Sequence, residues 1–184
     1  MDRRGFLALG LGGLGAAGLA LGTDHPPLDP EPIPAPDGDS AWPQPRCDAR
    51  NTGYCPRATP PARRPTVDWS TSFEAGGRPV VGSRVVVPTS GGLRAFDVTE
   101  GSQAWRVDAA LTSDAPVVDG AGTVYYLSHD RFAGYAADDG TVTWRARRQQ
   151  YANTGGPTLA DGRLYLPYFG VSALDGRGRV TWHT

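Results

Sequence analysis

AFDVTEGSQAW (95–105), GYAADDGTVTW (134–144) and ALDGRGRVTW (173–182) are three copies of one pattern, and this pattern decides the fold. Each copy begins with a small residue and carries a Gly four positions before its closing Trp. The small residues are Ala95, Gly134 and Ala173, the glycines are Gly101, Gly140 and Gly178, and the tryptophans are Trp105, Trp144 and Trp182. Counted from Trp69, these tryptophans are 36, 39 and 38 residues apart, a period typical of propeller and solenoid repeats.

A Pro and short apolar runs precede each copy, in RPVVGSRVVVP, APVVDGAGTVYYL and GPTLADGRLYLP. Val, Tyr and Leu in such runs favour strands, and the Gly and Asp at the joints favour turns. Each unit therefore predicts four short strands. The Gly supplies the positive φ of a tight hairpin, the small residue lets a neighbouring sheet approach, and the Trp wedges between sheets. Because a lone sheet has nothing to bury its faces against, we expect an all-β propeller architecture.

The units place the blades at about residues 79–108, 116–147 and 157–184. TVDWSTSF (66–73) is interpreted as the outer, Trp-bearing strand of a fourth blade whose inner strands are absent, so residues 66–184 form the repeat domain. Propellers typically need about 4–8 blades to close. The sequence thus predicts a partial propeller. It is either a truncated piece of a longer one, with exposed sheet edges, or a unit that self-associates to complete a ring.

The pattern Pro-V-V-x-G-x-[LV]-[VY], followed by A-x-D-x-x-x-G-x-x-x-W, resembles the PQQ-like β-propeller repeat. That repeat occurs in quinoprotein dehydrogenases and in BamB-like outer-membrane assembly scaffolds. WPQPRCDARNTGYCP (42–56) is similar to the segment that opens many secreted members. The resemblance covers about residues 42–184. The middle unit departs from it with Ala136 where Asp97 and Asp175 stand, and the third unit is one residue short.

The resemblance implies that a quinoprotein site needs a full ring, calcium ligands, a catalytic Asp and a stacking platform. Three blades cannot surround such a cofactor, and turn chemistry accounts for Asp97, Asp175 and Asp138-Asp139. His129-Asp130 is interpreted as a polar loop rather than an acid–base pair. The other histidines, His25 and His183, have no metal-ligand spacing. We therefore expect no catalytic residue, no metal site, no cofactor and no enzymatic activity.

Charge gives no indication of a nucleic-acid partner, because the formal net charge is −1. The one basic cluster, Arg145, Arg147 and Arg148, is interpreted as a solvated edge. The favoured hypothesis is a non-enzymatic scaffold or binding module for a protein or glycan partner. A fragment of a longer propeller without activity of its own is the alternative, followed by part of a quinoprotein oxidoreductase.

The N-terminal residues 1–22 resemble a twin-arginine export signal. Arg3 and Arg4 precede FLALGLGGLGAAGLALG, an uncharged run that is only weakly apolar because of its glycines. We expect export to the periplasm, cell surface or medium, with cleavage near Thr23. An uncleaved signal that anchors the chain in the membrane is the other reading.

Between the signal and the repeats, the Pro- and Asp-rich residues 23–41 predict a disordered spacer, because they contain too few apolar groups to offset ordering entropy. An irregular segment, residues 42–65, follows. It holds the chain's two cysteines, Cys47 and Cys55. In an exported protein this pair predicts a disulfide, with two unpaired thiols as the alternative.

Overall fold

The computed structural model describes residues 29–36, 42–56, 59–74, 76–109, 115–128, 131–147, 155–167 and 170–184. The predicted export signal, with Arg3 and Arg4, lies outside these residues. The described residues form strands and irregular segments. Within them, no helix has the length and apolar character needed to cross a membrane.

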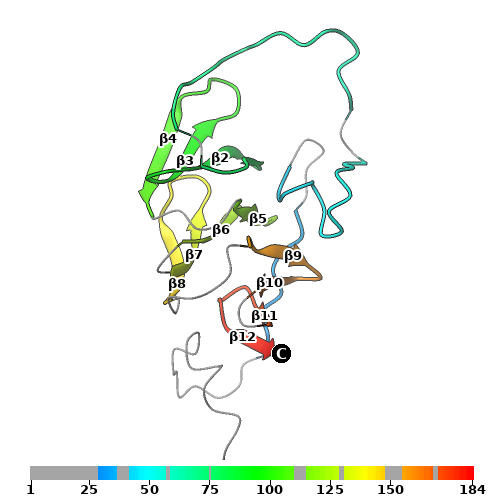
Figure 1. The fold of residues 1–184 in the computed structure, drawn as a ribbon, viewed down its shortest axis with the longest axis vertical. Coiled ribbons are helices and arrows are strands. Elements are labelled where there is room, and N and C mark those ends of the chain that lie inside the picture. Colours follow the sequence, from blue (N-terminus) through cyan, green and yellow to red (C-terminus); the bar gives the residue numbers. More distant parts are fainter. Residues whose placement is uncertain are drawn as a thin grey trace, which may run out of the picture.

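Twelve strands in the described residues make three four-stranded antiparallel sheets, each with its strands in chain order. The first sheet contains β1 (Val80–Val81), β2 (Arg84–Thr89), β3 (Gly92–Asp97) and β4 (Gln103–Asp108). The second contains β5 (Val117–Val118), β6 (Thr123–Leu127), β7 (Arg131–Ala136) and β8 (Val142–Arg147). The third contains β9 (Thr158–Ala160), β10 (Arg163–Pro167), β11 (Val171–Leu174) and β12 (Val180–His183). The predicted all-β fold of about three four-stranded blades is confirmed, and Figure 1 shows the sheets following one another along the molecule.

The small residue of each repeat pairs with the Trp of its own sheet. Ala95 lies opposite Trp105, Gly134 opposite Trp144 and Ala173 opposite Trp182, and each ladder shifts register directly after the small residue. A Cβ on Gly134 would lie 2.7 Å from Thr143 Oγ1 and 2.8 Å from Trp144 Nε1. The crowding at Gly134 thus comes from its own sheet, whereas the sequence analysis attributed the small residue to a neighbouring sheet.

Each sheet is joined to the next by a Trp that lies across a Gly, a contact we call the Trp–Gly seam. Trp105 of β4 covers Gly140 in the turn between β7 and β8, where a Cβ would lie 2.8 Å from the indole Cδ2. The Trp105 Nε1–H donates to the Ala137 carbonyl at 2.7 Å, and the side chain is 7% exposed. Trp144 covers Gly178 in the same way, with a Cβ there 2.6 Å from the indole Cε3.

The second seam lacks the indole hydrogen bond because the third repeat is one residue short. The Gly140 amide donates to the residue four positions back, Ala136, whereas the Gly178 amide donates three positions back, to Asp175. In the shorter turn, the carbonyl that corresponds to that of Ala137 is displaced from the position in which it would accept the indole N–H. Among the described residues, Trp144 Nε1 is buried without a hydrogen-bond partner.

Residues 66 to 73 do not pair as a strand, in contrast to the sequence expectation. No backbone hydrogen bond joins them to another described residue, since the described residues before them form no sheet to extend. Trp69 nevertheless covers Gly101, and its Nε1–H donates to the Val98 carbonyl at 3.0 Å. Its ring stacks on Phe96 with centroids 6.5 Å apart. The segment therefore contributes a Trp–Gly contact without a ladder.

Two apolar clusters fill the spaces between sheets. The first joins sheets β1–β4 and β5–β8 and contains Val80, Val86, Leu93, Trp105, Val118, Val124, Tyr126 and Tyr135. The second joins sheets β5–β8 and β9–β12 and contains Ile33, Val117, Tyr125, Phe132, Leu159, Leu164 and Leu174. Because the two clusters lie between the same pairs of sheets that the seams join, the clusters and the seams stabilise the same interfaces.

Gly140→Ala tests the steric part of the seam against Gly122→Ala, its matched control. Both glycines have φ near +75°, so each substitution adds about 1–2 kcal/mol of left-handed strain. Only the Cβ at position 140 enters the Trp105 ring, because at position 122 the nearest atom is 4.0 Å away. We expect urea denaturation to show an additional loss of about 1–3 kcal/mol for Gly140→Ala. Equal losses for the two variants would contradict the seam.

Candidate functional site

The candidate site begins where residues 42–44 cross the first strands of the three sheets. Trp42 exchanges two backbone hydrogen bonds with Val81 of β1, at 2.8 and 2.9 Å. The next residue, Pro43, accepts the Val118 amide of β5 at 2.8 Å. Trp42 and Pro43 therefore bond to the first strands of two sheets. These bonds lie on sheet edges that we expected to be exposed.

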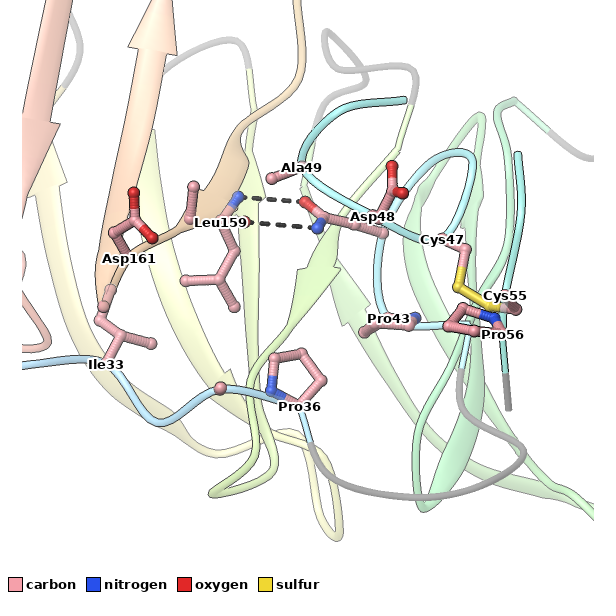
Figure 2. A pocket seen from close by; sticks show the side chains of 14 residues that line it. Ile33, Pro36, Pro43, Cys47, Asp48, Ala49, Cys55, Pro56, Leu159 and Asp161 are labelled. Atoms are coloured by element: carbon pink, nitrogen blue, oxygen red, sulfur yellow. Dashed lines mark hydrogen bonds between the residues drawn. A yellow bond between two sulfur atoms is a disulfide. The ribbon is translucent and has the colours of Figure 1, made fainter. Parts of the chain in front are cut away.

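Gln44 completes the crossing by pairing with β9 through its side chain. The Gln44 Nε2 donates to the Leu159 carbonyl at 3.3 Å, and its Oε1 accepts the Leu159 amide at 3.1 Å. The two bonds are the dashed lines at Leu159 in Figure 2. Because the amide of a Gln side chain has the same donor and acceptor groups as a peptide, it substitutes for a neighbouring strand. Its burial, at 6% exposure, makes this pairing important for stability.

Residues 29–36 dock on the hairpins of the second and third sheets, so the prediction of a disordered spacer is wrong for this part. The Ile33 amide donates to the Gly162 carbonyl at 2.8 Å, and Gly176 donates to the Glu31 carbonyl at 2.8 Å. Ile33 is 2% exposed and belongs to the second core cluster. The prolines around it restrict the chain before it docks, which lowers the entropic cost of ordering. One buried aliphatic side chain and backbone pairing thus hold the segment in place.

Cys47 and Cys55 form a disulfide with their Cα atoms 5.9 Å apart, which excludes the alternative of two unpaired thiols. Inside the loop, Asp48 accepts the Thr52 amide at 2.9 Å and the Thr52 hydroxyl at 2.5 Å. These bonds, the hydroxyl first, lower the pKa of Asp48, which keeps the carboxylate ionised. The disulfide and these hydrogen bonds hold the loop in a compact conformation.

The docked segment, the disulfide loop and the β9–β10 hairpin line a cavity of about 300 Å³ that is open to solvent. Figure 2 shows Ile33 and Pro36 on one side, Leu159 and Asp161 on the hairpin, and the disulfide opposite them. The lining is Ile33, Ala35, Pro36, Pro43, Gln44, Cys47, Asp48, Ala49, Cys55, Pro56, Leu159, Ala160, Asp161 and Gly162. These groups suit an apolar ligand, with two carboxylates to orient a positive charge. Sequence reasoning missed this cavity, because the burial of Ile33 depends on residues far along the chain.

The repeat carboxylates cap turns. Asp97 accepts the Thr99 and Glu100 amides at 2.8 and 3.0 Å and pairs with Arg84 at 2.6 Å. The backbone amides of Glu100 and Thr99 lower its pKa, and Arg84 adds to the effect. In the DDG turn, Asp139 accepts the Thr141 amide and hydroxyl, at 2.9 and 2.8 Å. In each of the two turns, one carboxylate oxygen accepts a backbone amide of the turn itself.

Asp175 is the buried version of the same cap, with 1% side-chain exposure. Its Oδ1 accepts the Arg177 and Arg179 amides, both at 3.0 Å, and its Oδ2 pairs with the Arg179 guanidinium at 2.6 Å. Burial raises the pKa, but the Arg179 guanidinium and the two amides outweigh burial and leave the pKa below its usual value.

Asp119 is a buried carboxylate that the sequence analysis did not single out. It accepts the Ala121 and Thr123 amides at 3.0 and 2.7 Å and the Tyr125 hydroxyl at 2.9 Å. Burial, and then the nearby Asp119 charge, raise the pKa of Tyr125. The DGAGT turn between two apolar runs is the sequence signal for such a cap.

The donor set does not fit the calcium and quinone of a quinoprotein. Asp97, Asp119 and Asp175 each bind their own turn, and no three His, Cys, Asp or Glu side chains cluster within the described part of the chain. His183 Nδ1 lies 2.9 Å from Ser172 Oγ. His129, Asp130 and Arg148 lie outside the described residues, and His25 does too.

The repeated seams, bulges and hairpins are consistent with the family to which the sequence matches. The PQQ_2 model, described as outer membrane protein assembly factor BamB, matches residues 34–184. The chain belongs to this family. The match to the BamB family confirms the PQQ-like propeller resemblance and includes part of the docked N-terminal segment. A comparison with curated proteins gives no match.

Solved structures with the same fold include BamB and quinohemoprotein alcohol dehydrogenases. BamB from Moraxella catarrhalis has a TM-score of 0.51 at 20% identity, covering 63% of this chain and 39% of that one. A quinohemoprotein alcohol dehydrogenase from Pseudomonas putida HK5 has a TM-score of 0.60 at 19% identity, covering 82% and 28%. One from Comamonas testosteroni has a TM-score of 0.58 at 18% identity, covering 78% and 27%. The chain therefore spans less than half of each of these proteins.

Asp175→Asn is expected to flatten the acid side of the stability profile. Because the folded-state pKa is lowered, the Asp175 contribution is present above the unfolded pKa of about 3.9. It is lost as the pH falls through the folded pKa. Urea denaturation between about pH 5 and pH 2 measures the slope, with the exposed Asp68→Asn as the charge-matched control. An unchanged slope would contradict the buried pairing with Arg179.

Proposed function

We propose that this chain is an exported, non-enzymatic scaffold of the BamB family that binds a protein partner through the cavity beside the disulfide. The observation that carries the proposal is the cavity itself, in which a covalent cross-link and the Gln44 pairing hold an apolar surface open. An apolar side chain of the partner fills it, and Asp48 and Asp161 attract a neighbouring Lys or Arg. The lining offers no aromatic ring for a sugar to stack on, which favours a protein over a glycan.

The absence of enzymatic activity is part of this proposal. It is supported by the repeat carboxylates, which are engaged by backbone amides and by Arg84 and Arg179 instead of converging on one point. A fragment of a longer propeller is the second candidate, because the chain spans only 27% to 39% of the solved relatives. In that case the cavity is one local site of a larger ring.

Export through a twin-arginine route is supported by Arg3 and Arg4 ahead of the uncharged run, and by the disulfide, which persists in oxidising compartments. We expect the double variant Arg3→Lys/Arg4→Lys to remain in the cytoplasm, as measured by cell fractionation and immunoblotting. Unchanged export of this variant would contradict the twin-arginine route and leave the binding proposal intact.

In-cell photo-crosslinking tests the binding site. A benzoylphenylalanine at Ala160, on the cavity wall, is expected to give one discrete adduct with a protein, and the same group at the exposed Val142 of β8 is the control. The adduct should be sensitive to protease and insensitive to glycosidases. Equal labelling at both positions, or none at Ala160, would contradict the proposed site.

A dye-reduction assay tests the enzymatic alternative. The protein is incubated with pyrroloquinoline quinone, calcium and primary alcohols, and we expect no alcohol-dependent reduction of the dye. Alcohol-dependent turnover would overturn the non-enzymatic proposal, whatever the result of the crosslinking.

A further inference from the structure

The disulfide between Cys47 and Cys55 is accessible from solvent. Both cysteines are half-buried, and both line the cavity, which is itself open to solvent. The residues on either side of Cys55 are exposed, Tyr54 by 67% and Pro56 as well. Figure 2 shows the two sulfur atoms on the side of the cavity opposite Leu159 and Asp161. A thiolate of another protein can therefore reach the disulfide, and such an attack is the first step of thiol–disulfide exchange.

The loop that the disulfide closes holds its backbone in an unfavourable conformation. Arg46, Cys47 and Asn51 have φ values of 58°, 74° and 55°, in the left-handed region that Asn tolerates and that Arg and Cys rarely adopt. In the described part of the chain, the only other non-glycine residue with a positive φ is Asp161, on the opposite wall of the cavity. Backbone strain of this kind persists only where the surrounding structure imposes it, and it gathers at functional sites.

Few contacts besides the disulfide impose this conformation. The Gly53 amide donates to the Arg46 carbonyl at 3.0 Å, and the Cys47 amide donates to the Gln44 carbonyl at 2.9 Å. Residues 45–56 are all described, and none of them belongs to a strand or to either core cluster. Cleavage of the disulfide therefore lets the loop relax, and it leaves the sheets and the apolar clusters in place.

Relaxation of the loop changes the cavity directly. Five of the 14 residues that line the cavity lie between Cys47 and Pro56. When Arg46 and Cys47 return to negative φ, the turn that begins at Gln44 opens and this wall moves away from Leu159. The apolar surface is then no longer preorganised, and preorganisation is a main source of affinity for a partner.

We propose that Cys47 and Cys55 are a site of reversible thiol–disulfide exchange with a protein dithiol, and that their reduction releases the partner bound in the cavity. The release rests on the proposed function, because the partner and its site are those of that proposal. The exchange site itself rests on the accessible disulfide and the strained loop.

The exchange balances between two pairs of cysteines. A thiolate of the dithiol protein attacks the sulfur of one chain cysteine, so that a mixed disulfide forms and the bond between the two chain sulfurs breaks. The other chain cysteine leaves as a thiolate and takes up a proton. The second thiolate of the dithiol protein then attacks its own sulfur in the mixed disulfide and releases the remaining chain cysteine. The chain gains two electrons and two protons, and the dithiol protein is oxidised to its disulfide.

Reduction under native conditions tests the exchange site without a partner. The full chain is incubated with reduced thioredoxin in the absence of denaturant, and its thiols are alkylated and counted by mass spectrometry. We expect complete reduction, reversed by oxidised thioredoxin, with a cooperative thermal melt retained. Hydrogen exchange of the Cys47 and Gly53 amides should accelerate by about tenfold or more, whereas the Val118 amide, bonded to Pro43, should be unchanged.

Three results of this experiment would overturn the proposal. Reduction that occurs only in urea would show that the disulfide is inaccessible in the folded chain. Loss of the cooperative melt on reduction, or in the variant Cys47→Ser/Cys55→Ser, would show that the disulfide supports the whole fold. Equal acceleration at all three amides would show that its effect is not confined to the loop.

The photo-crosslink from Ala160 tests the coupling to binding. Cys47→Ser/Cys55→Ser removes the cross-link permanently and should lower the yield of the adduct by about tenfold or more. Arg50→Lys, an exposed position in the same loop, keeps the disulfide and should keep the adduct. An equal yield in the double variant would overturn the release and leave the proposed binding site intact. No adduct with the wild-type chain would contradict the proposed function, and the reduction experiment alone would then decide the exchange site.

Discussion

The indole of Trp105 lying on Gly140, with its N–H on the Ala137 carbonyl, is the contact on which the arrangement of the sheets depends. A four-stranded sheet of this size cannot bury both of its faces alone, so its stability comes from its neighbours. The glycine has two roles in this contact, because its positive φ closes the hairpin and its missing Cβ leaves space for the ring. The two core clusters lie at the same interfaces and add the apolar area that one indole cannot supply.

The N-terminal segment adds a second constraint on the three sheets. Trp42, Pro43 and Gln44 cross β1, β5 and β9, so one short stretch bonds to all three sheets. Ile33 then fixes the upstream chain in the second core. The cavity exists because this segment and the disulfide loop leave a space beside β9 that their side chains do not fill. The proposed binding site and the stability of the fold thus depend on the same few residues.

Much of the fold was predictable, because each repeat carries its Gly and Trp at fixed spacing and Val- and Tyr-rich runs between turns. The Trp69 contact could be expected because Trp69 lies one repeat length before Trp105. The lack of strand pairing around it could not, because pairing depends on whether another strand lies beside it in the fold. The cavity was not predictable, since composition alone treats residues 29–36 as too polar and Pro-rich to order. Ile33 is buried in a cluster that includes Leu164 and Leu174, and no local pattern encodes so distant an association. The DGAGT sequence predicts the turn that Asp119 caps, but the burial of Asp119 depends on the neighbouring parts of the fold.

Hydrogen exchange of the indole N–H groups, followed by NMR, tests the seam most directly. The Trp105 N–H is buried and bonded to Ala137, and Trp182 is exposed on β12. We predict slow exchange for Trp105, limited by separation of the first two sheets, and faster exchange for Trp69, whose N–H bonds to Val98 from a segment that pairs with no strand. Exchange should be fastest for Trp182. Exchange of Trp105 as rapid as that of Trp182 would contradict the account.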